Sequence, residues 1–250
     1  MSVTLLKRLV LGFVFLFLLC LWSCQMEDKI QIKAYYFPVE ELKEGLVYEY
    51  NSVGKDSLAP EYWYYKTFEQ DSGLYFTGQY YNYDFEIGQF VSEEVVGNGT
   101  LLHQLFMYEP ADSNGQQLRF SVEIEVPNVF PFEVRDSGGV FLYKIKWTSP
   151  SQPERRTRLI RNRRYLGKRP YEFNGEQHEA IAFSTRDLIE TNEEGYQELQ
   201  YDGEEIYAKG IGLVYYRKAI DSNLVLEYQL KGRYKMEELE KKFAENLKQR

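Results

Sequence analysis

Cysteine is almost absent from this sequence of 250 residues. The two cysteines, Cys20 and Cys24, lie near the N-terminus, and none follows residue 24. A chain without thiols forms no disulfide, has no thiolate nucleophile and cannot bind zinc through sulfur. These chemistries are therefore excluded from everything that follows Cys24.

Histidine is equally scarce, with only His103 and His178. A zinc site needs three or four ligands, so two distant histidines without cysteine predict no metal site. Strand alternation places His103 on the face of Leu101 and Leu105, which predicts a core or pocket histidine. No Gly-x-Ser-x-Gly turn, the usual mark of a serine nucleophile, is present. We expect no catalytic residues and no cofactor.

Acidic residues outnumber basic residues in this sequence. The chain has 30 Lys and Arg against 38 Asp and Glu, with a formal net charge of −8. A domain that binds nucleic acid in general is expected to be basic. We therefore expect no nucleic-acid partner.

No apolar run is long enough to span a bilayer as a helix, which takes about 20 residues. The longest run, Leu9–Trp22, has 14 residues and follows Lys7 and Arg8. A basic start followed by a run of this length is typical of a signal peptide, and we assign residues 1–23 to one. A short uncleaved signal anchor is the alternative.

The end of this run carries a family resemblance. Leu21, Trp22 and Ser23 precede Cys24, and together they resemble the lipobox of bacterial lipoproteins, although Trp22 departs from the usual small residue. The resemblance implies cleavage before Cys24, a diacylglyceryl thioether on its sulfur and an N-acyl group such as palmitate. Two or more acyl chains hold a protein stably on a membrane. Residues 24–30 would then be the tether.

The segment Gln25-Met26-Glu27-Asp28-Lys29 follows directly. It resembles the short acidic export signal of Bacteroidota-type surface lipoproteins. The resemblance implies an outer-membrane lipoprotein that either faces the periplasm or is exposed on the cell surface. A solvated acidic tether is the alternative.

Residues 31–250 are expected to form a single β-rich domain. Aromatic residues make up 16% of the chain, and they fit a pleated sheet well. Period-2 alternation predicts clear strands at Leu118–Val126, Phe141–Trp147 and Asn223–Gly232. Weaker strands are predicted at Leu46–Tyr50, Tyr62–Phe68, Leu74–Tyr81, Phe85–Val91, Leu101–Tyr108, Glu179–Thr185 and Leu213–Lys218. Turn-forming clusters such as Gly97-Asn98-Gly99 and Asp202-Gly203 separate them, which predicts an antiparallel meander.

About ten or more strands exceed what a flat open sheet carries, because such sheets curl, split or close. We therefore expect a strongly curved sheet or half-barrel. At the C-terminus, Met236, Leu239, Phe243 and Leu247 recur on one helical face. They predict a helix at about 235–249 that docks on or plugs the sheet.

Both ends of the expected domain resemble a group of uncharacterised periplasmic lipoprotein domains. The matching segments are Tyr36-Phe37-Pro38, Gly45, Tyr48-Glu49-Tyr50 and Gly210-Ile211-Gly212-Leu213-Val214. The resemblance implies a curved half-barrel sheet, which in some relatives surrounds an apolar cavity.

The most unusual segment is rich in arginine. Residues 155–169 hold Arg155, Arg156, Arg158, Arg161, Arg163, Arg164, Lys168 and Arg169. Guanidinium groups suit phosphate and carboxylate, so the first six arginines are a candidate site for a polyanion. A solvated edge strand, protected by its charge from pairing with other strands, is the alternative.

A second candidate is the aromatic run Tyr62, Trp63, Tyr64 and Tyr65. Exposed together, these rings would form a platform for a sugar or a partner protein. Cross-strand pairing in the core is the alternative.

The leading hypothesis is thus a lipid-anchored, non-catalytic binding or scaffold domain for an envelope protein, a glycan or an apolar ligand. The second is a carrier or chaperone for lipid or another apolar ligand, which requires a cavity inside the sheet. An enzyme is the third, and it requires a polar cleft with His103 beside a carboxylate.

Overall fold

The computed structural model describes residues 29–54, 58–110, 115–135 and 139–249. The signal peptide, Cys24 and the first part of the tether lie outside the described residues.

The described chain begins with the short strand β1 (Ile30–Gln31) and the 3-10 helices η1 (Lys33–Tyr35) and η2 (Glu41–Glu44). The first strands of the main sheet are β2 (Leu46–Ser52), β3 (Glu61–Gln70), β4 (Gly73–Tyr81), β5 (Ile87–Val96), β6 (Gly99–Tyr108), β7 (Arg119–Ser121) and β8 (Glu123–Pro131). After the two-residue β9 (Glu133–Val134) come β10 (Val140–Thr148), β11 (Arg156–Phe173), β12 (Glu176–Asn192), β13 (Tyr196–Ala208), β14 (Gly212–Ala219), β15 (Val225–Tyr234) and helix α2 (Met236–Gln249).

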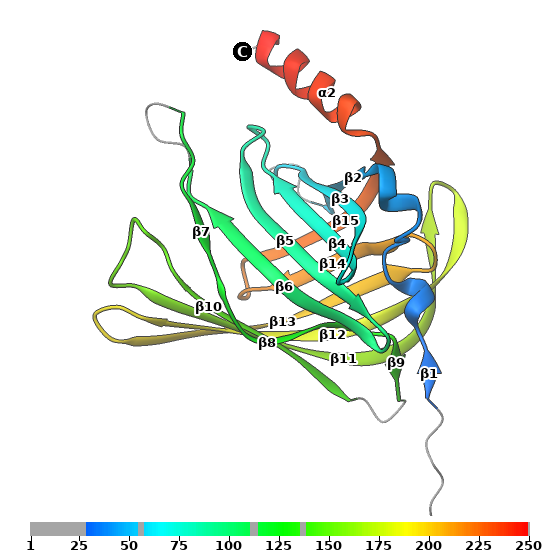
Figure 1. The fold of residues 1–250 in the computed structure, drawn as a ribbon, viewed down its shortest axis with the longest axis horizontal. Coiled ribbons are helices and arrows are strands. Elements are labelled where there is room, and N and C mark those ends of the chain that lie inside the picture. The colour runs from blue at the N-terminus through cyan, green and yellow to red at the C-terminus, as the bar shows by residue number, and fades with distance from the viewer. Residues whose placement is uncertain (1–28, 55–57, 111–114, 136–138, 250) are drawn as a thin grey trace, which may run out of the picture.

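Within the described residues, twelve strands form one closed antiparallel ring (Figure 1). Its order is β5-β4-β3-β2-β15-β14-β13-β12-β11-β10-β8-β6, and β6 pairs back onto β5. The predicted fold class, a mainly β antiparallel and strongly curved sheet with a C-terminal helix, is confirmed. The curvature continues to full closure, which removes the free edges of an open sheet.

Two predicted boundaries are wrong. The strand predicted at Leu118–Val126 is divided at Val122, whose N–H donates to the Leu105 carbonyl oxygen at 3.0 Å, and β7 and β8 result. The predicted turn at Asp202-Gly203 lies inside β13. Glycine is needed there because a Cβ on Gly203 would lie 2.4 Å from the Arg217 carbonyl oxygen of β14.

The N-terminal segment closes one end of the barrel (Figure 1). Residues 32–45, which we call the N-terminal plug, include the fully buried Ile32 and Leu42 and the nearly buried Tyr36. The plug is bound to the barrel by backbone contacts, among them the 3.0 Å hydrogen bond from Gly210 N–H to the Ala34 carbonyl oxygen. One end of the interior is therefore sealed by the chain itself.

Helix α2 packs on the outer surface of the barrel. Leu239 is fully buried and Phe243 nearly so, in a cluster with Val47 of β2 and Tyr62 of β3. The helix thus docks on the sheet, and the plug is supplied by the N-terminal segment instead. Within the described residues, no helix has the length and apolarity required to cross a membrane.

Candidate ligand cavity

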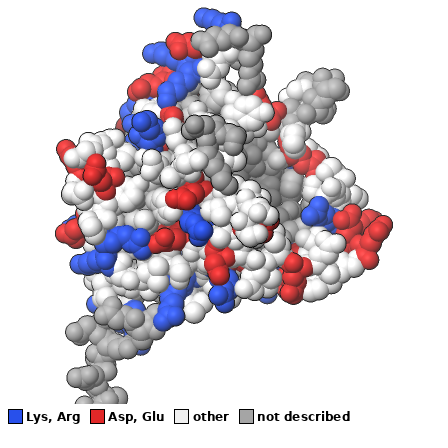
Figure 2. Space-filling model, turned by 180° about the vertical axis from the view of Figure 1, so that it is seen from behind, with Lys and Arg blue, Asp and Glu red and all other residues white. Residues whose placement is uncertain are grey.

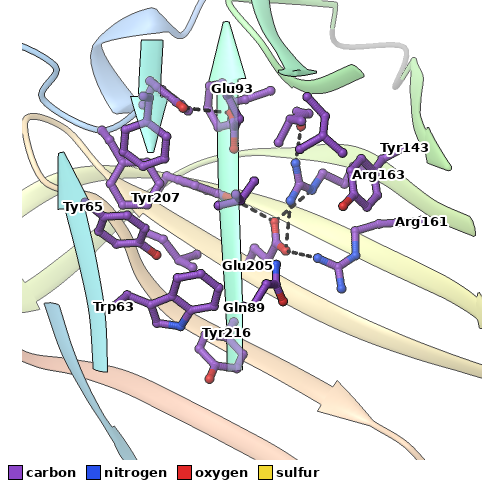
Figure 3. A pocket seen from close by; sticks show the side chains of 18 of the residues that line it. Trp63, Tyr65, Gln89, Glu93, Tyr143, Arg161, Arg163, Glu205, Tyr207 and Tyr216 are labelled. Atoms are coloured by element: carbon purple, nitrogen blue, oxygen red, sulfur yellow. Dashed lines mark hydrogen bonds and ion pairs between the residues drawn. The ribbon is translucent and has the colours of Figure 1, made fainter. Parts of the chain in front are cut away.

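The interior of the barrel contains a cavity of about 210 Å³. Its lining combines aromatic side chains with charged ones. In Figure 3, Trp63 and Tyr65 lie on one side, and Arg161 and Arg163 lie on the other beside Tyr143. Both kinds reach the interior because every second residue of a barrel strand points inward, and Trp63 and Tyr65 come from β3 whereas Arg161 and Arg163 come from β11. The cavity therefore has an aromatic wall and an ionic wall.

The aromatic wall is built by the plug and strands β3 and β4. The Phe37 ring stacks on the Phe76 ring with centroids 4.8 Å apart, and Tyr65 stacks on Phe76 at 5.2 Å. Trp63 continues the stack, 5.8 Å from Tyr65. These contacts place flat apolar surfaces along one side of the cavity.

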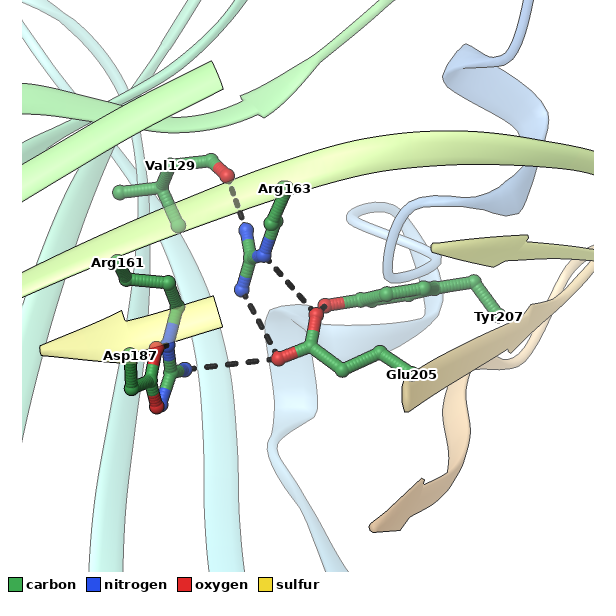
Figure 4. A network of polar contacts seen from close by, with 6 residues as sticks. All are labelled: Val129, Arg161, Arg163, Asp187, Glu205 and Tyr207. Carbon is green, nitrogen blue, oxygen red and sulfur yellow. Dashed lines mark hydrogen bonds and ion pairs between the residues drawn. The ribbon is translucent and has the colours of Figure 1, made fainter. Parts of the chain in front are cut away.

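The ionic wall comes from β11, β12 and β13 (Figure 4). Arg161 donates to Asp187 through two hydrogen bonds, Nε to Oδ1 at 2.8 Å and Nη2 to Oδ2 at 2.7 Å. Arg163 Nε lies 3.0 Å from Glu205 Oε2, which also accepts a 3.0 Å hydrogen bond from the Tyr207 hydroxyl. Two arginines are thus matched by two carboxylates.

Both carboxylates ionise readily despite their burial. Burial opposes the charge of Glu205, but Arg163 and Arg161 outweigh it and hold its pKa below the usual value. Burial likewise opposes the charge of Asp187, but the positive charge of Arg161 outweighs burial and lowers the pKa of Asp187. The network is therefore a set of buried ion pairs, in which removal of one partner leaves an unpaired charge.

A third carboxyl group, that of Glu93 on β5, behaves differently. Its Oε2 accepts hydrogen bonds from the Tyr36 hydroxyl at 2.9 Å and the Thr100 hydroxyl at 2.6 Å. Burial dominates and raises the pKa of Glu93. Glu93 therefore ties the plug to the barrel wall and takes up a proton more readily than an ordinary glutamate.

Lys218 on β14 also lines the cavity. Its Nζ lies 5.4 Å from the centroid of the Tyr216 ring, and among the described residues it makes no hydrogen bond or ion pair. Burial lowers the pKa of Lys218, because the charged form loses solvation. The sequence analysis missed this residue, although its spacing from Val214 and Tyr216 places all three on one face of the strand.

The candidate polyanion site does not form as one surface. Alternation along β11 turns Arg161 and Arg163 into the barrel, where they are paired. On the outside, Arg158 is paired with Glu125 and Glu190 at 3.1 Å each. Arg155, Arg156 and Arg164 are exposed. Lys, Arg, Asp and Glu side chains are interspersed on the face seen in Figure 2.

The candidate aromatic platform is divided for the same reason. Trp63 and Tyr65 point into the cavity, whereas Tyr62 and Tyr64 lie outside in the cluster with α2. Neighbouring residues of a strand face opposite sides of the sheet. The four rings therefore never share one surface.

The core assignment of His103 is wrong. Ser92 pairs with Gln104 and Glu93 with Leu102, so His103 is the extra residue of a bulge in β6, which makes Leu102 rather than Leu101 the inward residue. His103 is exposed, and its ring lies 5.2 Å from that of Tyr75. Within the described residues, no group of three or more His, Cys, Asp and Glu side chains could hold a metal ion.

A second hollow of about 660 Å³ lies on the barrel among Trp147, Arg156, Arg158, Glu190 and Tyr196. It is larger than the interior cavity, but Arg156 and Tyr196 are exposed and Arg158 is neutralised by its two carboxylates. The interior cavity, which is lined by buried and half-buried groups of both kinds, is the better candidate for a specific site.

The fold and the site together define a closed antiparallel barrel with a plugged end and an amphipathic interior. The chain is similar to the crystal structure of a putative lipoprotein from Parabacteroides distasonis ATCC 8503, with a TM-score of 0.50 and 12% sequence identity over 80% of this chain and 97% of that chain. A putative exported protein with YmcC-like fold from Bacteroides fragilis NCTC 9343 has a TM-score of 0.49 and 13% identity, over 80% of this chain and 99% of that chain. No family model and no curated protein matches the chain. At these identities the likeness concerns the fold.

Proposed function

We propose that this protein is a lipid-anchored protein of the bacterial outer membrane whose barrel binds a small amphipathic ligand without converting it. The observation that carries the proposal is the interior cavity with one aromatic and one ionic wall. Ligand pockets are typically concave and mostly apolar, with a few polar groups that orient the ligand.

The size of the cavity supports a ligand larger than water. About 10–15 Å³ of such volume suffices for one water molecule, and an engineered cavity of about 150 Å³ binds benzene. The interior space here is about 210 Å³. It therefore has room for a small organic molecule, which favours ligand binding inside the barrel over binding on an exposed aromatic platform.

The membrane anchor rests on the lipobox resemblance at Cys24. Ile30, the first residue of β1 next to the plug, follows Cys24 by six residues. An extended chain spans at most about 3.3–3.6 Å per residue, so the link reaches roughly 20 Å. A lipid on Cys24 would therefore keep the plugged end of the barrel near the bilayer.

A titration with N-phenyl-1-naphthylamine, an uncharged probe that fluoresces in apolar surroundings, tests the cavity. We expect saturable binding to the wild-type barrel. Gln89→Phe, which fills the cavity, is expected to weaken binding at least tenfold, because Gln89 lines it. Gln104→Phe, the same change at an exposed position of β6, serves as the control. Absence of saturable binding to the wild type would contradict the proposal.

Mass spectrometry of the mature N-terminus tests the anchor separately. We expect a diacylglyceryl-modified Cys24 at the N-terminus of the wild type and no lipid on Cys24→Ala. Unlipidated wild-type protein that still begins at Met1 would refute the anchor and leave the cavity proposal untouched.

A further inference from the structure

We infer that the ligand is an organic anion with an apolar body, and that Lys218 holds its acidic group. This inference rests on the proposed function, since it names the class of ligand for the same cavity. It follows from which polar groups of the lining already have partners and which do not.

The two arginines of the ionic wall already form ion pairs with carboxylates of the protein. Asp187 occupies Nε and Nη2 of Arg161, and Glu205 lies within ion-pair distance of both arginines, at 3.5 Å from Arg161 and 3.0 Å from Arg163. The remaining cation of the lining, Lys218, has no such partner among the described residues. A protonated lysine offers three donor hydrogens and accepts nothing.

The carboxylates of the lining, in contrast, all have donors. Glu205 accepts from Tyr207 and Arg163, and Glu93 accepts from Tyr36 and Thr100. Glu61 accepts a hydrogen bond from the Tyr216 hydroxyl. The acceptor side of the cavity is therefore largely satisfied by the protein itself.

Two further side-chain donors of the lining also support a ligand with acceptor atoms. Trp63 and Gln89 line the cavity, and neither side chain makes a hydrogen bond with another described residue. An indole N–H is a donor only, and a glutamine amide carries two donor hydrogens. A ligand with oxygen acceptors would give these two half-buried side chains hydrogen-bond partners.

Several charges surround Lys218. Burial and then Arg161 lower the pKa of this lysine, while Glu61, Asp187 and Glu205 raise it. None of these three carboxylates forms an ion pair or hydrogen bond with Lys218 among the described residues, so an incoming anion can pair with the ammonium directly. The rings of Phe37, Phe76 and Tyr65 then take the apolar body.

A matched pair of probes tests the inference. 8-Anilinonaphthalene-1-sulfonate has the same aromatic body as N-phenyl-1-naphthylamine and adds one sulfonate. We expect the wild-type barrel to bind the sulfonate probe at least tenfold more tightly than the neutral one. A tenfold change in affinity corresponds to about 1.4 kcal/mol, which a hydrogen bond between two charged groups can supply.

Lys218→Met is expected to abolish this preference, so that the two probes bind the variant with similar affinity, whereas Lys218→Arg retains the preference. Lys231→Met, the same change at an exposed position of β15, is the control and keeps the wild-type preference. Near-UV circular dichroism verifies that each variant is folded. If Lys218→Met does not fold, Lys218→Gln takes its place.

The outcomes separate the two proposals. Binding of both probes with equal affinity, or an unchanged preference in folded Lys218→Met or Lys218→Gln, would overturn the role of Lys218 and leave the binding cavity standing. Failure of both probes to bind would overturn the binding cavity itself.

Discussion

The Tyr36 hydroxyl donates a hydrogen bond of 2.9 Å to Oε2 of Glu93 in the interior of the barrel. The two residues are separated by 57 positions in sequence, and their contact joins the N-terminal plug to strand β5. Tyr36 is 4% exposed and Glu93 is 7% exposed, so water does not readily replace either partner. The bond is thus one of the contacts that keep the plug in place.

Tyr36→Phe is expected to destabilise the protein by about 1–2 kcal/mol, because Glu93 loses a buried hydrogen-bond donor. Urea denaturation followed by circular dichroism measures the loss. Tyr35→Phe is the matched control, since the Tyr35 hydroxyl bonds at 3.1 Å to Glu179 in a partly exposed place. An equal loss in the two variants would show that the buried Tyr36–Glu93 hydrogen bond contributes no more to stability than the partly exposed Tyr35–Glu179 bond.

Glu93→Gln is expected to change how stability depends on pH. Burial raises the pKa of Glu93 above its usual value of 4.5, so the folded state keeps the proton at pH values where the unfolded chain has released it. The wild type therefore loses stability as the pH rises from about 4.5 through the raised pKa. Glutamine has no charge to lose, and its carbonyl oxygen can still accept from Tyr36 and Thr100.

The free energy of unfolding of Glu93→Gln relative to wild type should thus increase with pH over this range. Chemical denaturation at a series of pH values gives the difference. A difference that stays constant with pH would mean that Glu93 ionises as it does in the unfolded chain.

Arg161→Met is expected to destabilise the protein by about 3–5 kcal/mol, because Asp187 and Glu205 keep their burial and lose a cation. The side chain of Asp187 is only 1% exposed. Arg164→Met, at an exposed position of the same strand, is expected to change stability by less than about 0.5 kcal/mol. Thermal or urea denaturation distinguishes these outcomes, and similar small effects for both variants would argue against a buried network.

Leu239→Ala is expected to destabilise the protein by about 2–3 kcal/mol, because Leu239 is the fully buried anchor of α2 on the barrel. Glu240→Ala, next to it on the exposed side of the helix, should be nearly neutral. Helix content and unfolding midpoint measured for both variants test the docking. A neutral Leu239→Ala would mean that α2 contributes little to the stability of the barrel.

Much of the fold can be predicted from local patterns. Strands β10 and β15 alternate cleanly between apolar and polar residues, and both form within a few residues of their predicted bounds. Strand β13 was missed, because its inward positions hold Tyr201, Gly203 and Glu205 rather than aliphatic residues. The pairing of β13 with both neighbours compensates for this weak pattern.

The candidate site was less accessible to prediction. The arginine segment was recognised from its composition. Which arginines lie inside the barrel (Arg161 and Arg163) depends on which face of β11 points inward. Arg158 and Arg164 lie on the other face. Lys218 carried only the weak signal of sharing a strand face with Val214 and Tyr216. Its lack of a partner becomes visible only when the surrounding strands are in place.

By itself the sequence determined the strand-rich class, the C-terminal helix and the absence of cysteine chemistry after Cys24, because these follow from composition and from spacings of two to four residues. Only the tertiary structure decided that the sheet closes, since closure needs β2 to pair with β15, as Tyr48 does with Arg233. No local pattern encodes a contact between segments so far apart in the chain. The same closure places charged and aromatic side chains around one interior cavity.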